Sequence, residues 1–199
     1  AEIPPLRRVW YEPIHGDGLI QLQEDRFLYN WRRQDDNAEY PRFKNIYPEF
    51  ENEWNIFREW YSNEIKGLFV PIRYELTYLN EVSPSKGWEK PTQTSQILSF
   101  LEKDWEEKIS HEVASQQYRL QLALPKESGF LTVNVKQVLK RPSEEKILLV
   151  EFSALSQASM DVLDIRSMSD WFSNSNEFIF DSFLELTKLD VQEKYWGRK

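Results

Sequence analysis

The alternation of apolar and polar residues predicts two paired strands at the start of the chain. Residues 7–13 predict a strand that ends at Pro13, and residues 19–32 predict the strand that returns beside it. The segment between them, His15-Gly16-Asp17-Gly18, predicts the turn, because its two glycines can adopt positive φ. The start of the chain is therefore expected to be a hairpin.

The returning strand is expected to have two chemically different faces. Side chains two residues apart share a face of a strand. One face then carries the aromatic residues Phe27, Tyr29 and Trp31. The opposite face carries Arg26, Leu28, Asn30 and Arg32. This pattern predicts an aromatic face that packs in the core. It also predicts a polar face, and the sequence does not identify what that face contacts.

A long amphipathic helix is predicted after the hairpin. Pro41 suits a first helical position, and Gly67 marks the end. Six aromatic residues recur at steps of three and four: Phe43, Tyr47, Phe50, Trp54, Phe57 and Tyr61. Glu49, Glu51 and Glu53 are expected on a solvated face. A coiled coil is the weaker alternative, since the repeat is short and its residues are bulky rings.

The remainder of the chain alternates between further strands and helices. Residues 70–82 predict a half-buried strand with Ile72, Tyr74, Leu76 and Tyr78 inward. Thr94 is expected to cap a helix that reaches Phe100, Leu101 and Trp105. Three strands are expected next, near residues 118–124, 131–135 and 147–154, as an antiparallel meander. Ser167 is expected to open a last long helix, and Thr187 with Asp190 a short helical tail.

The resulting element order is β-β-α-β-α-β-β-β-α. It predicts an α+β fold in which two long amphipathic helices cover one face of an antiparallel sheet of about six strands. The 199 residues suit a single domain, 1–199. The chain begins at Ala1 and soon reaches Pro4-Pro5, which predicts that an upstream segment is missing.

Composition narrows the possible partners. The net charge of −8 argues against nucleic acid or an anionic membrane as the main partner, and no apolar run is long enough to span a bilayer. Without cysteine, thiolate catalysis and cysteine metal sites are excluded. The 8 Trp, 9 Tyr and 12 Phe are the unusual feature, and they predict an aromatic core or a ring-lined groove.

The sequence contains no recognisable catalytic or cofactor motif. A zinc motif at His111-Glu112 would need a second histidine where Ser115 stands, and His15 belongs to the predicted turn. The six glycines form no phosphate loop or dinucleotide fingerprint. No metal and no cofactor are therefore expected. Carboxylates that meet only in space remain possible in an enzyme.

The candidate binding residues are polar side chains set among aromatic strands. On the returning strand, Arg26, Asn30 and Arg32 either pair with the acidic surplus or hold an anionic ligand. Asn80 either ties off the end of its strand or points into a pocket. The full candidate set is Arg26, Asn30, Trp31, Arg32, Tyr78 and Asn80.

The amino-acid sequence of several segments resembles a sporadically distributed bacterial protein family of unknown function. The similar segments are Arg8 to Tyr11, Leu19 to Arg32, Tyr40 to Phe43, Tyr74 to Asn80 and Tyr195 to Arg198. The resemblance covers nearly the whole chain. It implies a bacterial, cytoplasmic protein, and it implies an upstream strand and helix that family members carry. It transfers no catalytic residue.

These observations favour a non-enzymatic binding or protein-interaction module in a stress or defence setting. Its expected partner is a protein or a small molecule, and it can form oligomers. One alternative is an enzyme that uses Asp, Glu, Arg and Tyr residues in a pocket over the sheet. Another is a structural subunit of a larger assembly, which would leave a large apolar surface exposed in the isolated chain.

Overall fold

The chain forms two compact units, Ala1–Phe69 and Val70–Lys199. The computed structural model describes residues 8–12, 17–32, 39–65, 70–102, 108–157 and 165–198, with side chains from 167 onward in the last range. Within these described residues, each unit contains its own antiparallel sheet, of three strands in the first and four in the second. The α+β class is therefore confirmed. The prediction of one sheet of about six strands with both long helices on one face was wrong.

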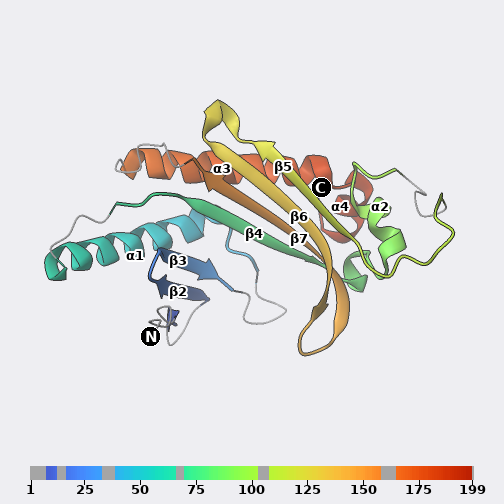
Figure 1. The fold of residues 1–199 in the computed structure, drawn as a ribbon, viewed down its shortest axis with the longest axis horizontal. Helices are drawn as coiled ribbons and strands as arrows, with labels where there is room; N and C mark the ends of the chain where they lie inside the picture. Colours follow the sequence, from blue (N-terminus) through green and yellow to red (C-terminus); the bar gives the residue numbers. More distant parts are fainter. Residues whose placement is uncertain are drawn as a thin grey trace, which may run out of the picture. The chain divides into compact units, whose positions relative to one another are not determined.

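The described part of the first unit is a three-stranded sheet with one long helix (Figure 1). Its strands are β1 (Val9–Tyr11), β2 (Gly18–Gln23) and β3 (Arg26–Trp31), in the order β1-β2-β3. Glu24 and Asp25 form the turn between β2 and β3, where a single strand over 19–32 was predicted. Helix α1 (Phe43–Glu64) follows. The predicted helix stop at Gly67 and the turn residues His15 and Gly16 lie outside the described residues.

The aromatic face predicted for β3 packs on the predicted aromatic stripe of α1, with Phe27 at the centre of the contact. The Phe27 ring centroid lies 5.3–6.2 Å from those of Phe50, Trp54 and Phe57 on α1. Trp54 is the best covered of these, at 6% exposed. Each such ring pair contributes about 0.5–1.5 kcal/mol beyond the area that it buries. This cluster therefore attaches α1 to the sheet.

The sheet of the second unit has the order β4-β7-β6-β5. Its strands are β4 (Glu75–Val82), β5 (Gln117–Ala123), β6 (Gly129–Lys140) and β7 (Glu145–Ser156). The meander from β5 to β7 and the central position of β7 are confirmed. At the start of β6, a Cβ on Gly129 would lie 2.0 Å from the carbonyl oxygen of Leu155, and its φ is 141°. Only glycine fits this close approach.

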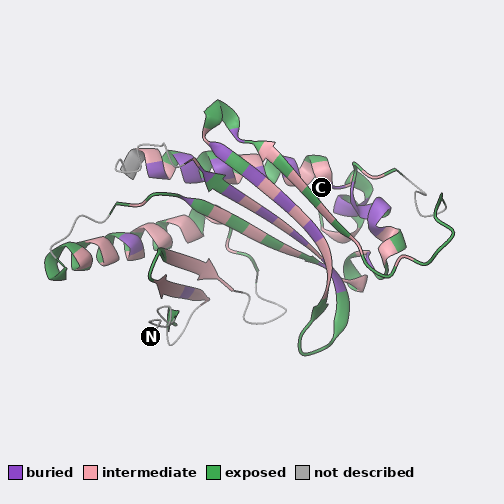
Figure 2. Ribbon diagram, viewed as in Figure 1, coloured by how far each residue is buried: buried purple, intermediate pink, exposed green. Residues whose placement is uncertain are grey.

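The core of the second unit lies between this sheet and helix α3 (Ile165–Leu186). Inward residues of β7 are buried, including Leu148, Val150, Phe152 and Ala154. From the helix, Trp171 and Phe172 contact Tyr74, with ring centroids 5.7 Å apart in each pair. Figure 2 shows the resulting alternation of buried and exposed residues along the strands. One sheet face is thereby fixed to α3.

Several boundaries in this unit differ from the predictions. The strand predicted from residue 70 begins at Glu75, and Ile72, expected inward, is 72% exposed. The helix predicted from Thr94 is the single turn α2 (Thr94–Ile97), because Ser99 N then donates to Leu186 O at 3.0 Å. Trp105 lies outside the described residues.

Short helical turns complete this unit. They are the 3-10 turns η1 (Pro84–Lys86), η2 (Pro91–Gln93) and η4 (Pro125–Glu127), and helix α4 (Leu189–Tyr195). The predicted helical tail is thus present. Neither Thr94 nor Thr187 caps a helix, however. Thr94 Oγ1 accepts a hydrogen bond from Trp88 Nε1 at 2.8 Å, and the Thr187 hydroxyl donates to Phe183 O at 2.6 Å.

Candidate functional site

The six candidate residues are divided between the two units. Arg26, Asn30, Trp31 and Arg32 belong to β3 or follow it directly, and Tyr78 and Asn80 belong to β4. Tyr78 Oη donates to Asn176 Oδ1 at 2.8 Å, which links β4 to α3. Asn80 Nδ2 donates to the carbonyl oxygen of Val150 at 3.3 Å. Because β4 continues to Val82, Asn80 does not close the strand. These two hydrogen bonds join elements of the second unit.

Trp31 is held by a carboxylate and a second ring. Its Nε1 donates to Asp17 Oδ2 at 3.1 Å, and its ring meets that of Tyr40 edge to face, with centroids 5.3 Å apart. The helix stripe therefore receives Phe27, whereas Trp31 packs against the segment that precedes α1. Of these partners, Asp17 was expected only in a turn, and Tyr40 had no predicted role.

Tyr29 lies in an acidic setting that the sequence did not reveal. Its hydroxyl donates a hydrogen bond to Glu49 Oε2, although Glu49 was predicted on a solvated face. Partial burial raises the pKa of Tyr29, and this hydrogen bond and the charges of Glu49, Glu53 and Asp17 raise it further. The phenol therefore stays protonated at neutral pH. No local pattern indicates this contact, because Tyr29 and Glu49 are 20 residues apart.

The polar face of β3 has a mixed set of partners. Arg26 forms a double hydrogen bond with the neighbouring carboxylate of Asp25, with both distances 3.1 Å. This bond lowers the pKa of Asp25. Arg32 Nη2 lies 3.0 Å from Glu12 Oε1. Both ion pairs are half exposed, and pairs of this kind stabilise a fold little because water and salt screen them. The predicted pairing of these arginines with acidic residues is thus observed.

Two buried donors on the same face have no partner. Asn30 Nδ2 and Arg32 Nε are each buried and make no hydrogen bond within the part of the chain that the structure describes. Leu19, which pairs with Asn30 across β2 and β3, is only 2% exposed. Buried donors without acceptors are rare in folded proteins, since each costs about 1–3 kcal/mol. The end of β3 therefore carries two hydrogen-bond donors that the described fold does not pair.

The described residues contain neither a metal-binding cluster nor a membrane-spanning helix. They contain no group of three or more His, Asp or Glu side chains arranged to hold a metal ion. His111 is exposed, and His15 lies outside the described ranges. Across those same ranges, no helix has the length and apolarity needed to cross a lipid bilayer.

Comparison with known proteins adds no relative. No protein-family model, no curated protein and no solved structure matches this chain. The family resemblance, the bacterial origin and the compartment stay predictions.

Proposed function

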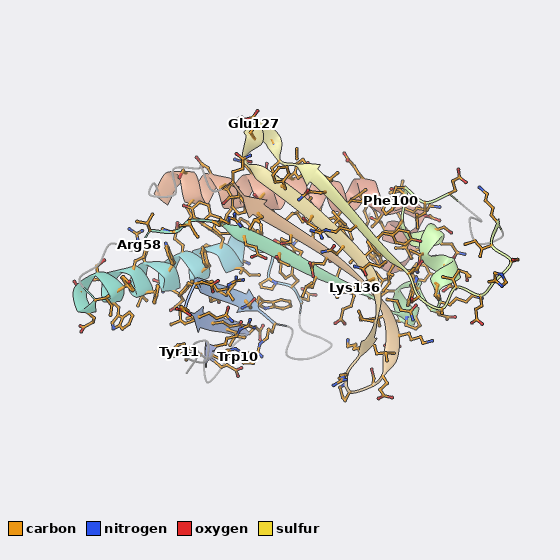
Figure 3. The ribbon with its side chains drawn as sticks, viewed as in Figure 1. Trp10, Tyr11, Arg58, Phe100, Glu127 and Lys136 are labelled. Atoms are coloured by element: carbon orange, nitrogen blue, oxygen red, sulfur yellow. The ribbon has the colours of Figure 1, made fainter. Side chains whose placement is uncertain are left out.

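We propose that this chain is a non-enzymatic protein-binding module and that its first unit carries the binding surface. The observation behind the proposal is the exposure of β1. Its three residues, Val9, Trp10 and Tyr11, are 44%, 52% and 54% exposed. Figure 3 shows Trp10 and Tyr11 at the rim of this unit. A run of exposed large apolar side chains is typical of an interaction site.

Helix α1 adds a second exposed apolar pair. Ile56 and Trp60 lie one turn apart and are 55% and 52% exposed. Trp54, on the side that packs against β3, is 6% exposed. The helix therefore has apolar residues both in its core stripe and on its outer side. Tryptophan and tyrosine are enriched at the centres of protein interfaces, where they bury large areas at a low entropic cost.

The acidic charge of α1 is suited to selective binding of a partner protein. The helix carries Glu49, Glu51, Glu53, Glu59 and Glu64 against Lys44 and Arg58. Exposed apolar residues can bind a partner protein, and the charged residues around them disfavour partners that carry the same charge. This combination supports a specific interaction surface in the first unit.

Site-specific photocrosslinking in the host tests the proposal. A photoreactive phenylalanine analogue replaces Trp10, Trp60 or, as the matched control on α3, Phe180, which is 59% exposed. We expect one partner protein to crosslink from positions 10 and 60 and not from position 180. Equal crosslinking from all three positions, or none from any, would contradict the proposal.

A further inference from the structure

Strand β3 is an edge of the first sheet. In the order β1-β2-β3, its residues pair with β2 and with no other strand of the described ranges. An edge strand offers a row of backbone donors and acceptors to any extended chain that lies beside it. With six residues, β3 is twice as long as the opposite edge strand β1. It is therefore the better template of the two.

The hydrogen-bond register identifies the outward groups. Arg32 N donates to Asp17 O at 2.9 Å, so this pair is of the hydrogen-bonded type. Such pairs alternate along an antiparallel ladder, which assigns Asn30 and Leu28 to the same type. The backbone groups of Phe27, Tyr29 and Trp31 then point away from β2. Nothing in the described part of the chain forms a further strand on that side.

The unpaired donors define what the added chain must carry. A strand beside β3 would form close, non-hydrogen-bonded pairs with Asn30, and side chains in such pairs lie about 4.5–5.5 Å apart. Asn30 Nδ2 and Arg32 Nε both lack an acceptor. Glu12 already pairs with Arg32 at Nη2, which leaves Nε of the same guanidinium without an acceptor. A carboxylate is the acceptor that best satisfies both an amide and a guanidinium.

We propose that β3 binds an extended, acidic segment of a partner protein as a fourth strand. Backbone hydrogen bonds form at Phe27, Tyr29 and Trp31, as in other cases of strand addition. Asn30 Nδ2 and Arg32 Nε are buried in the isolated chain, so both side chains turn toward the added strand and donate to carboxylates at its alternate positions. The inference rests on the proposed function, since it names the mode and chemistry of partner binding.

A selection from a display library of random ten-residue peptides tests this site on the full chain. We expect enriched peptides to carry Asp or Glu at alternate positions. In hydrogen exchange measured by NMR, a bound peptide should protect the amides of Phe27, Tyr29 and Trp31. Enriched peptides without alternating acids, no enrichment, or protection confined to other strands would each overturn the inference.

Two substitutions distinguish the loss of these hydrogen-bond donors from a general loss of stability. Asn30→Asp keeps the shape and removes the donor, and Arg32→Lys keeps the charge and removes Nε. Each should weaken the selected peptide at least tenfold. Arg119→Lys on the exposed face of β5 is the matched control and should change affinity less than twofold. Unchanged affinity in both β3 variants would overturn the inference.

The two proposals can fail separately. A partner that crosslinks at positions 10 and 60, yet binds the Asn30→Asp and Arg32→Lys variants normally, would leave the protein-binding module intact and reject strand addition. If those positions capture no partner, the proposed function itself fails.

Discussion

Single contacts around Tyr29 show how closely β2 and β3 are matched. Gly18 pairs with Trp31 in the ladder, and its Cα hydrogen faces the Tyr29 ring. A Cβ at position 18 would lie 2.6 Å from Tyr29 Oη. The hydroxyl is fixed by Glu49, so it cannot retreat without losing its hydrogen bond. The glycine is therefore required by side-chain packing.

Gly18→Ala should lower the free energy of unfolding by about 1–3 kcal/mol through overpacking. The measurement is urea denaturation followed by circular dichroism. In a Tyr29→Phe background, which removes the clashing oxygen, the same substitution should cost clearly less. Equal costs in both backgrounds would show that Tyr29 Oη is not the obstacle.

At the scale of elements, periodicity predicted most helices and strands but not their interruptions. The alternating pattern of residues 19–32 continues through Glu24 and Asp25, and this turn contains no glycine, asparagine or proline to mark it. The helix from Thr94 stops after one turn because Leu98 bridges to Thr187. Long-range pairing of this kind leaves no local signature.

The two tryptophans of α1 test the assignment of its packed side. Trp54→Ala should cost about 3–5 kcal/mol of unfolding free energy, because it leaves a cavity beside Phe27. Trp60→Ala, at a side chain that is 52% exposed and contacts the Phe57 ring, should cost only about 0.5–1.5 kcal/mol. Denaturant midpoints of the two variants check this, and similar losses would reject the packing described here.

At the scale of the whole molecule, the candidate site was partly predictable. Alternation placed Arg26, Asn30 and Arg32 on one face, and the structure keeps them there. That β3 is an edge strand was not predictable, because sheet order depends on which distant segments pair. The same holds for the division into two sheets, since local alternation does not report which strands share a sheet.

The terminal segment around Trp196 has a structural role within the second unit. Trp196 Nε1 donates to Lys86 O at 3.3 Å, and its ring lies 5.3 Å from that of Phe183. Arg198 Nη1 donates to the buried Gln192 side chain. The segment thus joins the last helix to the turn after β4 and to α3.

Removal of residues 196–199 should therefore destabilise the second unit by about 2–4 kcal/mol. The midpoint of urea unfolding provides the measurement. Leu189→Ala, at a side chain that is 54% exposed on α4, is the control and should have almost no effect. A truncated chain as stable as the full one would show that these contacts are dispensable.

The position of β7 constrains when the chain can fold during synthesis. It lies between β4 and β6, and its pairing with β4 joins Leu76 to Ala154 and Val82 to Leu148. When β4 leaves the ribosome, β7, its partner strand among the described residues, has not yet been translated. The sheet of the second unit is therefore completed late in synthesis. Until β7 is made, β4 is an unpaired strand that chaperones can bind and that can aggregate.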